Sequence, residues 1–154
     1  MLQEKLSVIS DGATAKGMLK RLKNKGVKVR DSAKSIILSK YYKPTEGIER
    51  CLAIFSTKDF LTNSIYTEEI REKASEFHLY LPKLETVLLV AEKYKYEETI
   101  KRKLGFSYLV FFHRPVKDPK GLPCLLAIDS NGVSDYYDKG GTPWDEYGGF
   151  VFEA

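Results

Sequence analysis

Apolar residues recur with helical spacing near the start of the chain, within residues 13–26. Four of them fall at positions i, i+3, i+4 and i+7 and would share one face of a helix: Ala15, Met18, Leu19 and Leu22. Lysines fall on the opposite face at the same spacing. We therefore predict an amphipathic helix that is capped at its start by Asp11 or Thr14 and ended by Gly26.

A second helical pattern covers residues 66–81. Ile70, Ala74 and Phe77 would line one face of this helix, and acidic residues occupy its first turn, where the helix dipole favours them. Thr67 carries a hydroxyl that is suited to capping the start. The pattern predicts a second amphipathic helix.

Compact apolar runs of strand length occur later in the chain. We predict a strand in each of four runs: residues 49–56, 107–112, 124–128 and 150–154. For the last of these strands we consider a position at the edge of the sheet. Asn131 and Gly132 follow the third run and precede another short one. This pair is typical of a two-residue hairpin turn, because both central positions of that turn need positive φ.

Other segments allow more than one interpretation. Val27 and Val29 alternate with basic residues, as in a short exposed strand. Residues 35–42 favour a strand over two turns of helix, because isoleucine and tyrosine suit a pleated surface. In residues 84–104, the continuous apolar run 88–91 favours a buried strand followed by a short helix. One long helix over residues 84–104 is the alternative.

Together these elements predict a single α+β domain over residues 1–154. It would contain a mixed or antiparallel sheet of about five strands and two or three helices. The chain has 154 residues and is long enough to bury a core without a disulfide or a metal ion.

The sequence lacks several signals, and this sets our expectations for the location and the ligands of the protein. No apolar run is long enough to span a membrane, and the first residues lack the pattern of a signal peptide. Cys51 and Cys124 lie beside apolar residues, as reduced, buried thiols do, and no cysteine or histidine falls at metal-ligand spacing. We therefore expect a cytoplasmic protein with no metal, no cofactor and no membrane partner. The pattern does not indicate an oligomeric state.

Charge is distributed unevenly along the chain. The formal net charge is +4, and residues 1–50 contain 12 Lys and Arg against 5 Asp and Glu. Seven basic residues are the predicted nucleic-acid contacts: Lys16, Lys20, Arg21, Lys23, Lys25, Lys28 and Arg30. Such side chains bind phosphates and give affinity without sequence readout. The alternatives are a solvated lysine face and a surface for an acidic protein.

Aromatic side chains suggest two further contacts. Four tyrosines occur in pairs that would stack on single-stranded bases or pack across a sheet: Tyr41, Tyr42, Tyr136 and Tyr137. Trp144, Asp145, Glu146 and Tyr147 lie between two glycine pairs and form a candidate site for a basic protein partner. The alternative is that Trp144 folds back onto the sheet.

Three residues are candidates for catalysis. His113 and Arg114 follow an apolar run and would face opposite sides of a strand, which weakens them as a pair. His113 is interpreted either as a strand-end histidine bonded to the backbone or as a general acid–base group. His78 suits the end of its helix. If His78 and His113 met, they could cleave a phosphodiester without metal, with Arg114 neutralising the phosphate.

A magnesium-dependent nuclease is not favoured. Such a site needs a carboxylate and a lysine on one face of a strand, whereas Glu92 and Lys93 are adjacent and would point to opposite faces.

Three functions remain. The preferred one is a small nucleic-acid-binding domain that uses the basic N-terminal segment, with metal-independent nuclease or toxin activity left open. The alternative is a protein-binding inhibitor, immunity or phage accessory module that uses the acidic end around Trp144. The third is an enzyme that acts on a small molecule with His113 as base. Whether any reaction is catalysed is not indicated by the sequence.

Overall fold

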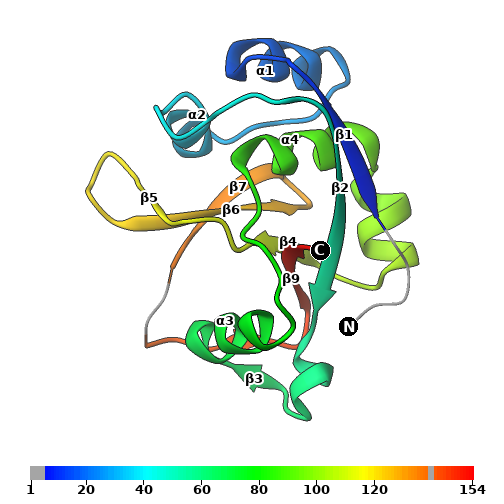
Figure 1. Ribbon diagram of the computed structural model, residues 1–154, viewed down its shortest axis with the longest axis vertical. Helices are drawn as coiled ribbons and strands as arrows, with labels where there is room; N and C mark the ends of the chain where they lie inside the picture. Colours follow the sequence, from blue (N-terminus) through cyan, green and yellow to red (C-terminus); the bar gives the residue numbers. More distant parts are fainter. Residues whose placement is uncertain (1–5, 139–140) are drawn as a thin grey trace.

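A mixed sheet of seven strands passes through the middle of the molecule (Figure 1). The computed structural model describes residues 6–138 and 141–154, and these residues form a single α+β fold. The strands are β1 (Ser7–Asp11), β2 (Glu46–Phe55), β4 (Tyr108–Phe111), β5 (Val116–Lys117), β6 (Pro123–Asp129), β7 (Gly132–Tyr137) and β9 (Gly148–Glu153). Their order is β1-β2-β9-β4-β6, and β5 and β7 both pair with β6. Only β4 and β9 run parallel among the pairs of this sheet that the structure describes.

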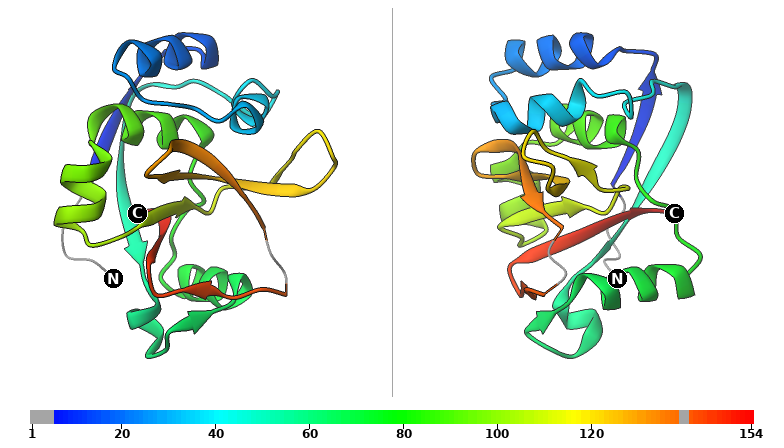
Figure 2. Two further views of the ribbon diagram at one scale, coloured as in Figure 1. Left: turned by 180° about the vertical axis from the view of Figure 1, so that it is seen from behind. Right: turned by 90° about the vertical axis from the view of Figure 1, so that its left-hand side faces the viewer.

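Helices lie on both faces of this sheet (Figures 1 and 2). On one side are α1 (Ala15–Asn24), α2 (Asp31–Ile37), α4 (Leu84–Lys93) and the π-helix η2 (Tyr96–Lys103). On the other side are α3 (Thr67–Glu76), the 3-10 turn η1 (Thr57–Phe60) and a two-stranded sheet of β3 (Ser64–Ile65) and β8 (Trp144–Asp145). The α+β class and the mixed sheet agree with the prediction, but the described residues hold more strands and helices than we predicted.

Strand β4 lies between two hydrophobic cores, and its successive side chains point alternately into one core and the other. Leu109 and Phe111 are fully buried in the core under α1, α2 and α4. Val110 and Phe112 are fully buried in the core under α3. The apolar run is continuous because each face of β4 meets a core of its own.

The helix α1 follows its prediction closely. The Oγ1 of Thr14 accepts a hydrogen bond from the N–H of Gly17 at 3.1 Å, and Met18 and Leu22 are buried. Gly26 follows the helix with φ +74°, a conformation that glycine adopts without strain. Local sequence therefore determines this helix and both of its ends.

The helix α3 is also present, but its cap differs from the prediction. Tyr66 occupies the cap position and makes no side-chain capping bond, so the predicted cap at Thr67 is wrong. Thr67 is instead the first helical residue, and its Oγ1 accepts a hydrogen bond from Nε1 of Trp144 at 2.9 Å. The hydroxyl thus joins α3 to β8.

The strand predicted for residues 35–42 is wrong, because Asp31–Ile37 forms α2. Ala33, Ile36 and Ile37 have helical spacing and are all buried. Val29 does take part in strand pairing, through a single parallel bridge to Val133.

The strand predicted for residues 88–91 is also wrong. These residues lie in α4, and every residue from Leu84 to Ala91 is buried. Apolar residues occupy most sides of the helix because the sheet and α1 pack against it, and their continuous run mimics a doubly covered strand. The alternative of one helix over residues 84–104 is closer, although extended backbone at Tyr94 separates α4 from η2. No helix in the described ranges has the length and apolar character needed to cross a membrane.

The final strand β9 occupies the centre of the sheet, between β2 and β4, so an edge position is wrong. It is buried along its whole length. Gly148 allows this packing, because an added Cβ would lie 2.2 Å from the ring of Tyr108.

The hairpin of β6 and β7 is present, with its turn shifted by one residue from the prediction. Asp129 pairs with Gly132, so Ser130 and Asn131 form the loop. Among the described residues of this turn only Gly132 has positive φ, +93°. A type I turn followed by a left-handed glycine has this pattern.

Replacing Gly132 with alanine should lower the free energy of unfolding by about 2 kcal/mol. An added Cβ would lie 2.1 Å from the carbonyl oxygen of Lys28. It would displace the hydrogen bond from the N–H of Val133 to that oxygen, now 2.9 Å long. Urea unfolding measures the effect. Gly121→Ala is the control, because Gly121 has φ +81° but nothing within 4 Å. Equal losses in the two variants would mean that the contact with Lys28 does not constrain position 132.

Candidate nucleic-acid interface

The seven predicted contacts lie on α1 and on the segment that connects it to α2. Six of them are exposed to solvent: Lys16, Lys20, Lys23, Lys25, Lys28 and Arg30. Arg21 is different, because its Nε donates to Oε2 of Glu92 at 2.6 Å and its Nη1 donates to Oδ2 of Asp11 at 2.7 Å. The guanidinium lowers the pKa of both carboxyls through these hydrogen bonds. Arg21 therefore joins α1 to α4 and its charge is matched within the protein.

A groove of about 690 Å³ begins where this basic segment leaves α1. Three parts of the chain line it: residues 25–28, residues 91–98 at the junction of α4 and η2, and residues 128–132 at the β6–β7 turn. The N–H of Arg30 donates to the carbonyl oxygen of Val133 at 2.9 Å and ties the basic segment to β7. A volume of this size is typical of ligand-binding clefts. We call this hollow the basic groove.

Four carboxylates of the described chain line the basic groove, and two of them are paired with cations of the protein. Glu92 binds Arg21, and Oε2 of Glu97 lies 3.6 Å from Nζ of Lys101. Asp129 accepts a hydrogen bond from the hydroxyl of Tyr136 at 2.7 Å, which leaves its charge in place. Glu98 is exposed and forms no salt bridge among the described residues.

The lysines around the basic groove are less engaged. Nζ of Lys25 reaches the carbonyl oxygen of Glu92 at 3.5 Å, and Nζ of Lys93 donates to the carbonyl oxygen of Ser7 at 2.7 Å. Lys28 and Lys95 are exposed and form no salt bridge within the described part of the chain. The four lysines of the lining therefore outnumber Glu98 and Asp129, the two lining carboxylates that form no salt bridge among the described residues, and the groove keeps an excess of positive charge.

Two tyrosines that we did not predict as contacts line the basic groove. Tyr94 and Tyr96 are half-buried, and their hydroxyls donate to the carbonyl oxygens of Ser7 at 3.0 Å and Ser107 at 2.8 Å. Anchoring by these bonds fixes the rings. Desolvation raises the pKa of the Tyr96 hydroxyl. The signal in the sequence is the alternation of lysine and tyrosine in residues 93–96.

The tyrosine pairs singled out from the sequence are divided by the fold. Tyr42 is buried, and Tyr136 packs against Tyr108 and Trp144. Tyr41 and Tyr137 are exposed, but neither lines the basic groove.

His113 is buried with an exposed fraction of 3%, and the backbone engages both of its ring nitrogens. Nε2 accepts the N–H of Leu126 at 2.8 Å, so the ring proton is on Nδ1, which donates to the carbonyl oxygen of Arg114 at 2.7 Å. Burial lowers the pKa of His113 to about 4. These contacts agree with the interpretation of a backbone-bonded histidine, and they leave no free nitrogen for proton transfer.

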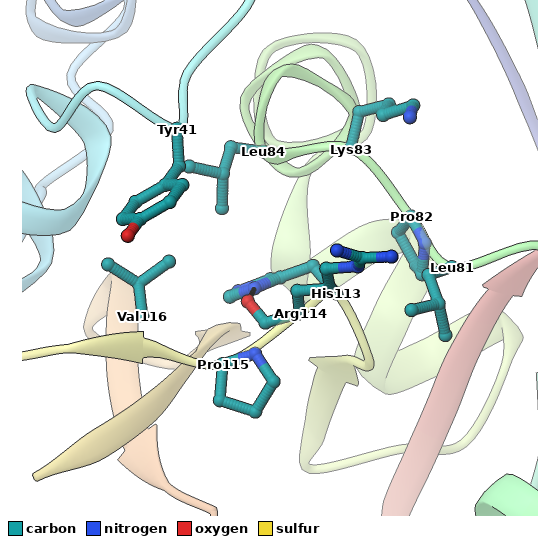
Figure 3. Close-up of a pocket in the computed structure, with 9 residues that line it drawn as sticks. All are labelled: Tyr41, Leu81, Pro82, Lys83, Leu84, His113, Arg114, Pro115 and Val116. Carbon is teal, nitrogen blue, oxygen red and sulfur yellow. Dashed lines mark hydrogen bonds between the residues drawn. The ribbon is translucent and has the colours of Figure 1, made fainter.

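His78 and Arg114 do not join His113 in a catalytic group. His78 is exposed and adopts φ +57° just after the end of α3. Arg114 is exposed and lines a small hollow with His113 at the start of α4 (Figure 3). His78 is not among the residues that line this hollow. Catalysis by these three residues stays a prediction that no described contact supports.

The candidate partner site around Trp144 is divided by the fold, because Trp144 is buried while Asp145, Glu146 and Tyr147 are exposed. Trp144 is buried in an aromatic cluster under α3, as in the alternative interpretation. Oδ1 of Asp145 accepts a hydrogen bond from the hydroxyl of Tyr108 at 2.8 Å. Glu146 and Tyr147 are exposed. Trp144 therefore stabilises the fold and is not presented to a partner.

Both cysteines are free thiols. Cys124 is buried, and burial raises the pKa of its thiol to about 11. Comparison with models of known protein families, with curated proteins and with solved structures gave no match.

Proposed function

We propose that the protein binds single-stranded nucleic acid along the basic groove. The observation that carries this proposal is the charge balance of the groove. Two of its four carboxylates, Glu92 and Glu97, are paired with Arg21 and Lys101, whereas none of its four lysines forms a salt bridge among the described residues. A phosphate backbone supplies the missing negative charge and releases its counterions on binding.

The tyrosines favour a single strand over a duplex. Tyr94 and Tyr96 lie beside the lysines of the groove, with their hydroxyls anchored to the backbone. Unstacked bases can pack on such rings while nearby lysines hold the phosphates. The exposed lysines of α1 extend the positive surface from the groove: Lys16, Lys20 and Lys23.

The proposal is one of binding and includes no reaction. The residues that line the basic groove include no histidine, within the part of the chain that the structure describes. His113 lines another hollow and has both nitrogens bonded to the backbone. The proposal assigns no acid–base role to the carboxylates and tyrosines of the groove.

Fluorescence anisotropy with a labelled oligouridine and a labelled oligodeoxythymidine tests the proposal. We expect affinity to fall steeply with salt, because the slope of log K against log salt is about −0.7 per phosphate contact on a single strand. The double variant Lys25→Glu/Lys28→Glu should weaken binding by at least about 10-fold and flatten the slope by more than one unit. An RNA duplex of the same length should bind more weakly than the single strand.

The matched control is Lys58→Glu/Lys117→Glu, which changes the net charge by the same amount. Lys58 in η1 and Lys117 in β5 are exposed and lie outside the groove. Binding by this control should weaken much less than binding by the groove variant. Equal losses in the two variants, or affinity that does not depend on salt, would contradict a role for the groove.

A further inference from the structure

A second hollow lies at the start of α4, whereas the basic groove lies at its end. It has a volume of about 300 Å³. The residues that line it are drawn in Figure 3: Tyr41, Leu81, Pro82, Lys83, Leu84, His113, Arg114, Pro115 and Val116. The volume is at the lower end of the range for small-molecule pockets. The nucleic-acid proposal does not involve this site, which we call the α4 pocket.

The walls of the α4 pocket are mostly apolar. Leu84 and Val116 are buried and belong to the hydrophobic core. The ring of Tyr41 faces Val116, and Pro82 and Pro115 lie on other sides of the hollow (Figure 3). Such walls suit a flat apolar group, because burying it removes apolar surface from water.

Two hydrogen bonds of the His113 ring hold the backbone beside the α4 pocket in place. Nδ1–H donates to the carbonyl oxygen of Arg114, and Nε2 accepts the N–H of Leu126 in β6. The next residue, Pro115, has a restricted φ. The turn that carries the Arg114 side chain is therefore positioned before any ligand arrives.

Two cations border the α4 pocket without a matching carboxylate. Lys83 and Arg114 are exposed, and no lining residue is acidic within the described part of the chain. A carboxylate behind the rim is that of Glu153, whose Oε2 accepts the N–H of Lys83 at 2.8 Å. Glu153 is buried and shares Arg50 with Glu85, each at 3.1 Å. The exposed charges at the rim of the pocket are therefore those of Lys83 and Arg114, and both are positive.

We propose that the α4 pocket binds a small organic anion that consists of a flat apolar body and one carboxylate or phosphate group. The apolar body would lie against Tyr41, Leu84 and Val116. The anionic group would lie at the rim between Lys83 and Arg114, where hydrogen bonds to two cations reinforce each other. An arginine suits this role because its planar fork can bind two oxygens of one anion.

Chemical-shift mapping with phenyl phosphate tests the site on the intact protein. We expect saturable binding, with shifts centred on the backbone of residues 81–84 and 113–116. Inorganic phosphate has only the anionic group, and benzyl alcohol has only the apolar ring. Each should bind at least about 10-fold more weakly than phenyl phosphate. Benzylamine should not bind, because its charge is repelled by the rim.

Arg114→Gln and Lys83→Gln should each weaken phenyl phosphate binding by about 10-fold. Lys117→Gln is the matched control, since Lys117 is exposed nearby but does not line the pocket, and it should stay within about 2-fold of the unmodified protein. If benzyl alcohol bound as tightly as phenyl phosphate, recognition of an anion would be overturned. If inorganic phosphate bound as tightly as phenyl phosphate, recognition of the apolar body would be overturned. Shifts centred elsewhere, or unchanged affinity in Arg114→Gln, would overturn the site.

Discussion

Replacing Arg50 with leucine should lower the free energy of unfolding by about 3–5 kcal/mol, as measured by urea unfolding at neutral pH. Nη1 of Arg50 donates to Oε1 of Glu153, and Nη2 donates to Oε1 of Glu85, both at 3.1 Å. The side chains of Arg50, Glu85 and Glu153 are only 11%, 3% and 6% exposed. Removing the cation would leave two carboxylates buried near each other with no counter-charge.

The position of this network explains why the loss should spread through the fold. Arg50 lies in β2, Glu153 in β9 and Glu85 in the first turn of α4. Glu85 also accepts hydrogen bonds from the N–H and the hydroxyl of Thr45, and Glu153 accepts one from the hydroxyl of Thr86. The network thus joins two central strands to the helix that fills the larger core.

Two further variants separate charge from packing at Arg50. Adding Glu85→Gln and Glu153→Gln to Arg50→Leu should recover at least half of the lost free energy, because the uncompensated charges are gone. Arg102→Leu should change stability by less than about 0.5 kcal/mol, because Arg102 is exposed on η2. If the triple variant recovered nothing, lost packing and not buried charge would be the cause.

The elements that we predicted correctly are those whose pattern is local. In α1, the apolar stripe, the cap at Thr14 and the glycine at its end all lie within a few residues of each other. The β6–β7 hairpin has the same property, since its turn residues lie next to its strands. In such segments propensity, periodicity and end signals agree, and tertiary contacts do not need to overrule them.

The errors arose where one segment carries two patterns. In α4, Leu84, Val87, Leu88 and Ala91 have helical spacing, but Leu89 and Val90 are buried too, and together they make the continuous apolar run of a covered strand. The central position of β9 depends on pairing with β2 and β4, which are far away in sequence. No pattern within residues 148–153 specifies those partners, because a buried strand looks alike at the centre and near the edge.

The candidate interface was predicted only in part, because much of its lining comes from segments that are far apart in the sequence. The exposure of Lys25 and Lys28 was expected from their run of basic residues. The rest of the basic groove comes from residues 91–98 and 128–132, which only the fold brings beside them. The matching of Arg21 by Glu92 likewise joins side chains 71 residues apart.

Lowering the pH from 7 to 4 should remove about 3 kcal/mol of stability through His113 alone. Burial lowers the pKa of His113 from its ordinary value of 6.5 to about 4, so the folded protein holds this ring neutral near pH 7. In the unfolded chain the ring takes up a proton below about pH 6.5. Between these two values the unfolded state binds more protons, so stability falls as the pH falls. The His113 contribution is complete above pH 6.5 and is lost as the pH approaches 4.

Urea unfolding at steps between pH 4 and pH 7 measures this dependence, and His113→Gln isolates it. Glutamine does not titrate, so the variant should be less stable at pH 7 and lose about 3 kcal/mol less than the unmodified protein on acidification. His78→Gln is the control, since His78 is the other histidine of the chain and is exposed. Carboxylates such as Glu92, whose pKa Arg21 lowers, titrate alike in all three proteins and cancel in the comparison. Parallel pH profiles for the unmodified protein and His113→Gln would show that the buried ring does not control acid stability.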